Sequence, residues 1–271
     1  MEAMAATKEF NGKWALVTGA SAGIGAALAR ELARQGAKLI LTARRKERLE
    51  SLAAEFAAQG VETRIVVADL CDPAAPEQIY DATRDLAVDI LINNAGLGQY
   101  GAFHSSPPEQ ELSMVRVNCE AVVRISRLFL PRMVERRRGW VLVVASTASF
   151  QPLPYFATYA ATKVFDRFFA LGLAEEVAQY RIKVTALCPG TTESEFFEVA
   201  RASVFRSRKL QSAEEVARLA VAALVRGQRT FLPKPGNRLT AFLVRFLPVG
   251  HITRFVEKAA RPKPEPPVPT P

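Results

Sequence analysis

The sequence predicts an α/β fold in which a doubly wound parallel sheet forms a single domain, followed by a C-terminal helical extension. Three observations predict it. Short apolar runs alternate with longer helical segments, the runs show little polar alternation, and a glycine-rich turn follows the first run. We expect the sheet domain at residues 10–235, amphipathic helices at residues 236–260, and a disordered Pro-rich tail at residues 261–271.

The expected strands are short and apolar, and each is followed by a turn or a helix. They lie at Lys13–Thr18, Lys38–Thr42, Glu62–Ala68, Asp89–Asn93, Trp140–Ala145, Arg181–Leu187 and Thr230–Leu232. The first expected helix follows the glycine turn and ends near Gln35, and the others lie at Arg45–Ala58, Ala74–Leu86, Pro107–Arg136, Phe156–Ala178 and Glu214–Arg226. Gly36 and Gly60 follow the first two helices, where a left-handed residue often ends a helix.

The composition suits a protein in a reducing compartment. Of the 271 residues, 49% are hydrophobic and 23% are charged, which suits one large core with a soluble surface. The three cysteines lack paired spacing and there are only two histidines, so we expect neither disulfides nor a metal site. Residues 1–10 lack a signal-peptide pattern, and no apolar run reaches the ~18 residues of a membrane span. We expect a cytoplasmic protein.

The net charge of +9 is concentrated near the C-terminus. Between Arg229 and Lys263 there are eight Lys or Arg residues and one acid, Glu257. This segment is either a solvated basic surface or a weak contact with an anionic membrane surface. Nucleic acid is not expected as a partner, because the chain has no known reader motif.

A glycine-rich run at Thr18–Gly25 lies between the first expected strand and helix, where dinucleotide phosphates are bound. Gly19 permits the tight turn, Gly23 lets the backbone approach the pyrophosphate, and Gly25 permits close packing of the helix. The run predicts a Rossmann-type nucleotide site, although glycines also serve turns for structural reasons alone. The other expected cofactor contacts in the run are Ser21 and Ile24.

The end of the second expected strand indicates which nucleotide is bound. An NAD site places a carboxylate there for the ribose 2′-hydroxyl, but this chain has Ala43, Arg44 and Arg45. Two guanidinium groups suit a 2′-phosphate, which a carboxylate would repel. The sequence therefore favours NADP(H), and the alternative is that both arginines only begin a charged helix.

Polar residues follow the third and fourth expected strands, at the sheet edge where such folds bind ligands. Asp69 lies where the adenine amino group is expected, and Leu70 is its neighbour. After the fourth strand comes Asn93, and an alternative reading of the asparagines here is a purely structural turn. The cofactor contacts expected after it are Asn94, Ala95 and Gly96.

Tyr159 and Lys163 lie four residues apart in an expected helix, so their side chains share one face. The ammonium group favours the phenolate and lowers the pKa of Tyr159, which makes the phenol an acid/base at neutral pH. Hydride transfer needs such an acid and a partner for the substrate oxygen, but no nucleophile. No G-x-S-x-G turn marks Ser146 as a hydrolase nucleophile. The structural alternative for Tyr159 is a half-buried helix aromatic.

With these motifs in order, the chain resembles the shorter type of short-chain dehydrogenase/reductase. The resemblance covers about residues 10–235, and the segment Pro189–Phe197 resembles a mostly bacterial branch related to acyl-chain and steroid ketoreductases. Its motifs are Thr18–Gly25, Asp69, Asn93–Gly96, Asn118, Ser146, Tyr159-x-x-x-Lys163 and Pro189-Gly190.

The resemblance implies a role for each residue. Tyr159 exchanges the proton of the substrate oxygen, Ser146 hydrogen-bonds the same oxygen, Lys163 holds the nicotinamide ribose, and Asn118 completes a water relay to Lys163. Ala22 stands where some NADP-dependent members carry a basic residue, which leaves the 2′-phosphate to the two arginines. The nicotinamide contacts that it implies are Pro189, Gly190, Thr191, Thr192 and Ser194, of which the last replaces a more usual threonine.

The segments expected to wall the substrate pocket favour an apolar substrate. The chain is therefore expected to be an NADPH-dependent carbonyl reductase or alcohol dehydrogenase for an apolar ketone or secondary alcohol. Two alternatives are a nucleotide-sensing module without turnover and a peripheral membrane protein. The wall residues are Leu97, Tyr100, Phe103, Phe150, Tyr155, Phe196, Phe197 and Phe205.

Two sets of apolar residues predict further contacts. The first set exceeds what one sheet face needs, and with the family resemblance it predicts a homodimer or homotetramer: Val122, Leu128, Phe129, Phe165, Phe168 and Phe169. The second set recurs at helical spacing in Pro233–Ala260, which predicts one or two short amphipathic helices broken at Pro248 and Gly250. These helices are expected either to pack on their own or a neighbouring subunit without a further role, or to form a lid or a subunit contact, with a membrane contact as the remaining alternative.

Overall fold

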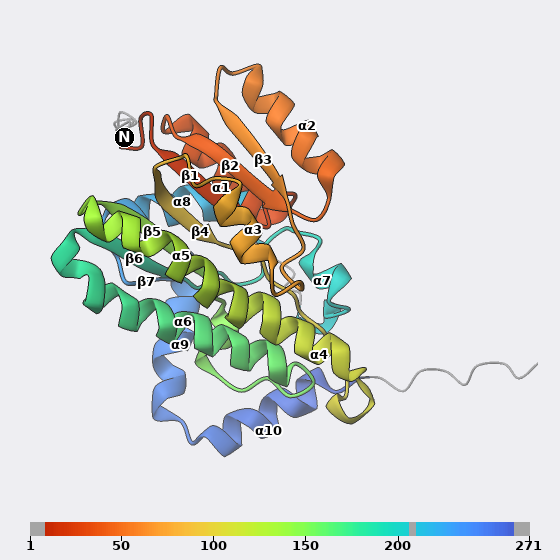
Figure 1. Ribbon diagram of the computed structural model, residues 1–271. Helices are drawn as coiled ribbons and strands as arrows, with labels where there is room; N and C mark the ends of the chain where they lie inside the picture. Colours follow the sequence, from red (N-terminus) through yellow and green to blue (C-terminus); the bar gives the residue numbers. More distant parts are fainter. Residues whose placement is uncertain (1–8, 206–209, 263–271) are drawn as a thin grey trace, which may run out of the picture.

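A seven-stranded parallel sheet forms the centre of the computed structural model, which describes residues 9–205 and 210–262 (Figure 1). The strand order is β3-β2-β1-β4-β5-β6-β7. The doubly wound α/β fold expected from the sequence is confirmed. The strands of the described part are β1 (Trp14–Thr18), β2 (Lys38–Ala43), β3 (Thr63–Val67), β4 (Val88–Asn93), β5 (Gly139–Val144), β6 (Ile182–Leu187) and β7 (Thr230–Phe231).

Helices connect and cover the strands. The α-helices are α1 (Gly23–Arg34), α2 (Lys46–Ala57), α3 (Ala75–Asp81), α4 (Pro108–Val115), α5 (Ala121–Glu135), α6 (Ala157–Val177), α7 (Phe196–Val199), α8 (Ala213–Val225), α9 (Pro235–Leu243) and α10 (Val249–Ala260). The shorter turns are η1 (Phe103–Ser105), η2 (Arg116–Glu120), η3 (Thr147–Phe150), η4 (Ala178–Tyr180), η5 (Ser203–Phe205) and η6 (Val244–Phe246). In the described part of the chain, no helix is both long enough and apolar enough to cross a bilayer.

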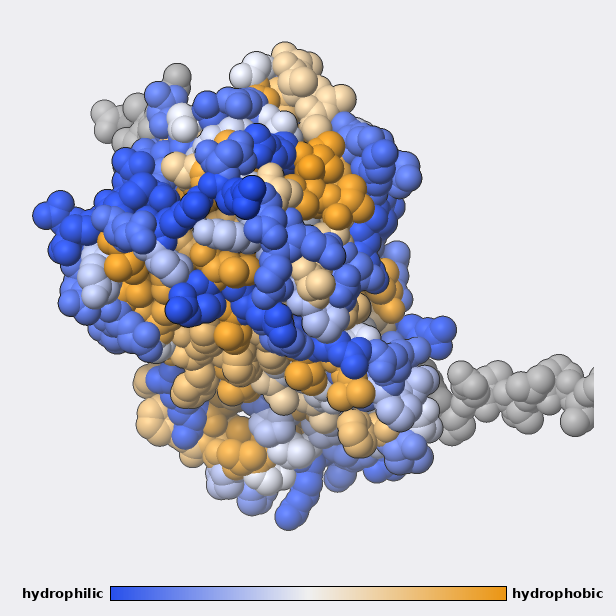
Figure 2. All heavy atoms as spheres, in the orientation of Figure 1, coloured by the Kyte–Doolittle hydropathy of each residue, from blue (hydrophilic) through white to orange (hydrophobic). Residues whose placement is uncertain are grey.

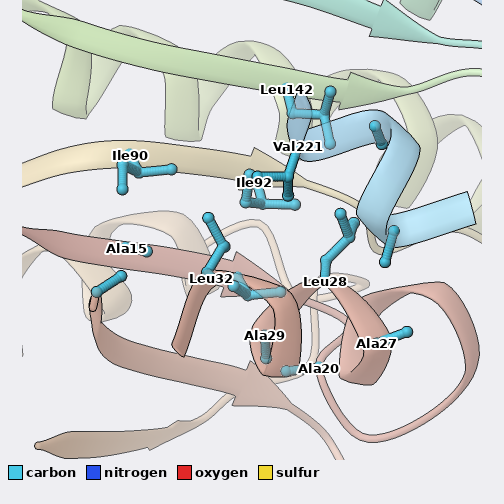
Figure 3. Packing of buried hydrophobic residues seen from close by; sticks show 14 of the residues in the cluster. Ala15, Ala20, Ala27, Leu28, Ala29, Leu32, Ile90, Ile92, Leu142 and Val221 are labelled. Atoms are coloured by element: carbon cyan, nitrogen blue, oxygen red, sulfur yellow. The ribbon is translucent and has the colours of Figure 1, made fainter. Parts of the chain in front are cut away.

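The two faces of the sheet carry separate cores. Residues of α1, α2 and α8 pack on one face, and residues of α3, α5 and α6 pack on the other. Figure 3 shows Leu28 and Leu32 of α1 beside Ile90 and Ile92 of β4, with Val221 of α8 close by. Each of these side chains is fully buried, and burial of such a side chain stabilises the fold by about 1.5–3 kcal/mol. This packing fixes α1, and with it the glycine turn at its start.

The position of β1 beside β4 creates the crevice in which the site lies. The chain runs outward from β1 to β3, returns to β4 on the other side of β1, and continues outward to β7. The loops after β1 and β4 therefore diverge at the carboxyl edge of the sheet. Thr18 ties these loops together, because its hydroxyl oxygen accepts hydrogen bonds from the backbone N–H groups of Asn94 (2.9 Å) and Ala95 (3.0 Å).

Three elements differ from the sequence-based expectation. Helix α3 ends at Asp81 instead of Leu86, because the buried Thr83 hydroxyl donates to the Ile79 carbonyl oxygen (2.7 Å) and competes with helical bonding. The long helical region at residues 107–136 is split by the π turn η2 between α4 and α5. The loop after β6 contains α7 and η5, which the sequence pattern did not predict.

The C-terminal segment forms two α-helices, where the sequence predicted one or two. They lie below the sheet domain in Figure 1, drawn in blue. The break falls at Pro248, as expected, but Gly250 lies inside the first turn of α10 rather than breaking it. Residues 263–271 of the expected tail lie outside the described residues.

The apolar residues expected at a subunit contact divide into two groups. Val122 and Phe129 of α5 are 5% and 3% exposed and belong to the core, so they do not support a contact surface. Phe165 and Phe168 of α6 are 38% and 61% exposed. Among the expected residues, the second pair therefore carries the homo-oligomer prediction.

Candidate active site

A cleft of about 570 Å³ opens at the carboxyl edge of the sheet. The loops after β1, β2, β3, β4, β5 and β6 all contribute to its lining. Every residue expected to contact the cofactor lines it: Gly19, Ser21, Gly23, Ile24, Gly25, Arg44, Arg45, Asp69, Leu70, Asn94, Ala95, Gly96, Tyr159, Lys163, Pro189, Gly190, Thr191, Thr192 and Ser194. Ser146 also lines the cleft, whereas Asn118 is fully buried behind it.

The glycines after β1 form a cradle that larger residues would fill. A Cβ atom on Gly19 would lie 2.9 Å from the Ala95 Cα atom, and Gly19 has a left-handed φ of +66°. A Cβ atom on Gly23 would lie 2.9 Å from Ser194 Cβ, and one on Gly25 would collide with the Gly19 carbonyl oxygen. The turn therefore carries no side chains at these glycines, where α1 begins. This geometry fits the pyrophosphate of a dinucleotide at a helix N-terminus.

Asn94 has a structural part in this cradle. Its side-chain amide donates to the Thr18 carbonyl oxygen at 2.8 Å, which holds the β4 loop against the glycine turn. Asn93 is buried beneath it and donates to the Ser126 hydroxyl oxygen at 3.0 Å. The structural interpretation of the asparagines therefore holds for Asn93, while Asn94 both ties the loops and lines the cleft.

The two arginines after β2 lie at one end of the cleft. Arg45 donates to the Ser21 hydroxyl oxygen (3.1 Å) and to a Glu195 carboxylate oxygen (2.8 Å). Arg48 donates to the other oxygen of Glu195 at 2.6 Å, and these bonds lower the pKa of that carboxyl group. Arg44 lies 3.9 Å from Asp69. The guanidinium groups are therefore held at the cleft rather than directed away along the helix.

Tyr159, Lys163 and Ser146 meet in the middle of the cleft. Tyr159 and Lys163 are 8% and 4% exposed, because α6 packs against β5, β6 and the turn η3. Lys163 donates to the Val144 carbonyl oxygen at 2.8 Å, which fixes the ammonium group below the phenol. The Ser146 side chain lies near the Tyr159 phenol and lowers its pKa by hydrogen bonding. The local spacing and the tertiary position of β5 together assemble an acid and an oxygen partner.

The pKa of Tyr159 shifts upward, against the expectation from the sequence. Burial raises it above its ordinary value, while Lys163 and the bond with Ser146 lower it by less, and Asp166 adds to the rise. The lysine therefore acts in the expected direction, but burial outweighs it. Burial also lowers the pKa of Lys163, and Asp166 and Tyr159 more than compensate, so that its pKa is raised. At neutral pH the phenol is protonated and the amine is charged.

A group of aromatic side chains, which we name the aromatic chamber, adjoins the catalytic trio of Ser146, Tyr159 and Lys163. Phe156 stacks on Tyr159 with ring centroids 4.3 Å apart, and Phe205 stacks on Phe156 at 5.5 Å. Of the residues expected to wall the pocket, five line the cleft: Leu97, Phe150, Phe196, Phe197 and Phe205. The expectation is wrong for Phe103, which is 67% exposed. Tyr100 and Tyr155 pack behind the aromatic side chains of the wall and do not themselves line the cleft.

Comparison with known proteins identifies the family. The chain matches the short chain dehydrogenase family over residues 13–204. It belongs to that family. The chain is 36% identical over 201 residues to a very-long-chain 3-oxoacyl-CoA reductase of Anas platyrhynchos, covering 71% of this chain and 64%, less than two thirds, of the relative.

Two further relatives match nearly their whole length. An uncharacterised oxidoreductase, YvaG, of Bacillus subtilis (strain 168) is 30% identical over 253 residues, covering 93% of this chain and 90% of YvaG. The solved structure of a short-chain dehydrogenase from Sphingobium yanoikuyae in complex with NADPH has 32% identity and a TM-score of 0.80, covering 86% of this chain and 93% of the other. The family and the fold expected from the motifs are both confirmed.

Asn118 occupies a π turn, a feature that often marks functional sites. Its side chain accepts from the Leu97 N–H at 2.8 Å and donates to the Leu97 carbonyl oxygen at 2.9 Å and to the Thr162 hydroxyl oxygen at 2.9 Å. In this short-chain dehydrogenase the residue therefore fixes the loop after β4. Its expected part in a water relay to Lys163 stays a prediction.

Asp166 was missed in the sequence analysis. Its carboxylate accepts a hydrogen bond from Lys163 Nζ at 2.8 Å, and the two side chains are 1% and 5% exposed. The second oxygen of the carboxylate is buried without a partner in the described part of the structure. The signal was available, because an acid three residues after Lys163 on an apolar helix face points to a pairing.

Helix α9 also contributes residues that the motifs did not predict. Asn237, Thr240, Ala241 and Val244 line the cleft. Asn237 lies so close to Gly190 that a Cβ atom there would collide with its side-chain amide. Helix α9 therefore forms part of the cleft wall, and its expected role as a lid stays a prediction. Sequence motifs could not reveal this contact, because it joins two segments of the chain that no spacing relates.

The pKa values of the three cysteines are raised, and burial is the largest cause for each. All three cysteines are free, and burial raises the pKa of Cys119 to about 12 and that of Cys188 to about 11. No group of His, Cys, Asp and Glu residues there is arranged to hold a metal ion.

Proposed function

We propose that this short-chain dehydrogenase is an NADPH-dependent reductase of apolar carbonyl compounds, which also oxidises the corresponding secondary alcohols. One observation carries the proposal. The buried Tyr159 hydroxyl, with Ser146 and Lys163, lies at the junction between the glycine cradle and the aromatic chamber. An acid placed between a nucleotide site and an apolar site is what hydride transfer to a carbonyl group requires.

The residues of the cradle fit NADP(H). The bare turn at Gly19, Gly23 and Gly25 accommodates the pyrophosphate, and Arg44 and Arg45 suit a 2′-phosphate. The NADPH complex of the Sphingobium relative supports this choice. When bound, the nicotinamide supplies the hydride, and the protein supplies position and charge.

The catalytic trio supports reduction at neutral pH. Because burial raises the pKa of Tyr159, the phenol is protonated and donates its proton to the carbonyl oxygen as negative charge develops there. The Ser146 hydroxyl donates to the same oxygen and stabilises that charge. The Lys163 ammonium group then stabilises the phenolate that Tyr159 becomes, which limits the cost of ionising a buried phenol.

The chamber supports an apolar substrate. Phe150, Phe156, Phe196 and Phe205 line it, and such walls bind alkyl and ring surfaces rather than sugars. The similarity to very-long-chain 3-oxoacyl-CoA reductases supports a 3-oxoacyl thioester or another ketone with a long alkyl group.

NADPH oxidation with a panel of carbonyl compounds tests the proposal. The panel includes aliphatic 2-ketones of increasing length, a 3-oxoacyl thioester and a ketose, with chiral analysis of the alcohols. We expect turnover that rises with alkyl length and none with the ketose. Tight NADPH binding with no turnover of any compound would instead favour the nucleotide-sensing alternative.

The cellular setting is a further part of the proposal. The free cysteines support a cytoplasmic location. The exposed Phe165 and Phe168 on α6 support a homodimer or homotetramer. Sedimentation equilibrium at micromolar concentration tests the assembly, and a monomer alone would contradict it.

A further inference from the structure

The two C-terminal helices carry large apolar side chains on their outer surface. We name this surface the C-terminal apolar face. Figure 2 shows hydrophobic residues among hydrophilic ones at the bottom of the view, where α9 and α10 lie in Figure 1. Its members are Leu239 (60% exposed), Phe242 (55%), Leu243 (49%), Phe246 (71%), Leu247 (54%), Val249 (60%) and Phe255 (75%).

The fold of the domain does not explain this face. In α9 the residues toward the cleft are Asn237, Thr240 and Ala241, and Val244 of η6 follows them. At 3.6 residues per turn, Leu239 and Phe242 lie on the opposite side of α9, and Phe246 of the following turn η6 is 71% exposed. The inner side already covers the cleft and its neighbouring core. The outer apolar side chains therefore either contact a partner outside the domain or promote aggregation.

The rings on the face are arranged as an anchor. Phe242 and Phe246 contact each other edge to face, with centroids 5.1 Å apart. In α10, Phe255 is exposed, whereas Ile252, one turn before it, is buried. Over the described residues 235–260, the C-terminal segment thus exposes large apolar side chains, as interfacial helices do, and buries only Ala241, Ile252 and Ala260.

Positive charge surrounds the face. The segment from Lys234 to Arg261 contains six Lys or Arg residues and one acid, Glu257. Glu257 is engaged, because it accepts hydrogen bonds from Arg261 (2.9 Å) and from the Tyr155 hydroxyl (2.7 Å). Basic residues beside exposed aromatic and aliphatic ones complement an anionic lipid surface, each cation adding to the attraction.

A second copy of the chain fits this face less well. A two-fold contact through the face would bring the same surface of both subunits together. Arg245 and Arg254 are exposed around the phenylalanines, so a two-fold contact would place like charges opposite one another. An anionic bilayer removes that repulsion and buries the same apolar groups.

We propose that the C-terminal apolar face docks this protein on an anionic lipid bilayer. The rings of Phe242, Phe246 and Phe255 enter the acyl boundary while Arg245 and Arg254 contact the head groups. The inner side of α9 stays in place as a wall of the cleft, so the cleft lies next to the lipid. That an apolar carbonyl compound reaches the cleft from the bilayer rests on the proposed function, whereas the docking itself does not.

Sedimentation with lipid vesicles tests the docking. The full-length protein is mixed with vesicles of phosphatidylcholine alone and of phosphatidylcholine with phosphatidylglycerol. We expect at least about tenfold stronger binding to the anionic vesicles, weakened by salt because the attraction is electrostatic. Equal binding to both vesicles, or binding to neither, would overturn the proposal.

Matched variants locate the contact. Phe242→Ser with Phe246→Ser should weaken anionic vesicle binding at least tenfold, whereas Phe103→Ser, at a residue 67% exposed elsewhere, should not. Arg245→Glu with Arg254→Glu should abolish the preference for anionic lipid, whereas Arg84→Glu with Arg218→Glu, also exposed, should retain it. If both target pairs bind like the wild type, the face is not the contact.

Two controls separate the possible failures. NADPH oxidation with a water-soluble ketone should stay within about twofold of wild type in every variant, since none of the altered residues lines the cleft. Absence of turnover in the wild type would reject the proposed function but leave the vesicle result standing. If Phe242→Ser with Phe246→Ser reduces the size of the assembly without lipid, and vesicle binding is absent, the face is a subunit contact and the proposal is wrong.

Discussion

The catalytic cleft and the C-terminal helices place side chains in opposite environments. In the cleft, the charged pair Lys163 and Asp166 is almost fully buried, with defined partners. On the C-terminal helices, Phe246 and Phe255 are 71% and 75% exposed. Burying a charge costs desolvation free energy, which a protein accepts for chemistry or specificity. Exposing a cluster of apolar rings favours aggregation, which a protein accepts for recognition. The first region shields charge from water, and the second exposes apolar rings to it.

The largest effect is expected from loss of the acid in the cleft. Tyr159→Phe should lower kcat for carbonyl reduction by about 10²–10⁴, because it removes the proton donor and keeps the ring stacked on Phe156. NADPH affinity, measured by fluorescence titration, should change less than about threefold. Ser146→Ala should lower kcat by about 10²–10³ as loss of one oxyanion donor does. Near-normal turnover of Tyr159→Phe would mean that another group gives the proton.

The buried ion pair should dominate the stability of the cleft. Asp166→Ala should lower the free energy of unfolding by about 3–5 kcal/mol, because it leaves the Lys163 ammonium group buried without its partner. Glu55→Ala breaks a partly exposed pair with Arg30 and should cost no more than about 1 kcal/mol. Urea unfolding compares the two variants. Equal effects would show that burial of the pair adds nothing.

The pH dependence should follow the raised pKa of Tyr159. Reduction uses the protonated phenol, so kcat should be flat through neutral pH and fall about tenfold per pH unit once the pH exceeds that pKa, which lies above the ordinary value of about 10. Oxidation of the alcohol should show the opposite slope. The stability contribution has the same sign: it is complete below the ordinary pKa and is lost as the pH rises through the folded-state pKa.

A variant sharpens this pH prediction. The hydrogen bond with Ser146 lowers the pKa of Tyr159, so Ser146→Ala should move the break in the pH profile of reduction to higher pH. A break that moves to lower pH would contradict the assignment of the phenol as the titrating group.

The nucleotide end of the cleft should set the cofactor preference. Arg44→Ala with Arg45→Ala should reduce the ratio of kcat/KM for NADPH over NADH at least tenfold, since each charge-assisted bond to the 2′-phosphate is worth about 1.5–3 kcal/mol. Arg48→Ala is the control, because Arg48 also bonds Glu195 but does not line the cleft. An unchanged preference in the double variant would show that the arginines only begin α2.

The smallest effect is expected where the two regions join. The Tyr155 hydroxyl donates to Glu257 of α10 at 2.7 Å, and water competes for both groups because the bond lies near the surface. Tyr155→Phe should raise KM for a bulky ketone severalfold and leave NADPH affinity unchanged. Tyr180→Phe, in the turn after α6, should change neither. A loss of NADPH affinity in Tyr155→Phe would mean that the helices also hold the nucleotide end.

Local patterns predicted most of the fold and much of the candidate site. The apolar runs located β1 to β7 because a buried parallel strand needs apolar residues on both faces. The spacing of Tyr159 and Lys163 placed both on one face of α6 because helical geometry is local. Helix α3 was predicted too long, because the bond from Thr83 to Ile79 is not visible in hydropathy.

The sequence by itself determined the parallel sheet, the bare glycine turn, the two arginines after β2 and the pair of Tyr159 and Lys163, since each depends on residues close together in the chain. Only the tertiary structure decided that burial raises the pKa of Tyr159, that Asn237 lies against Gly190, and that the rings of α9 and α10 face outward. Burial and contact depend on which distant segments pack together, and that packing is set by the whole fold rather than by any local spacing.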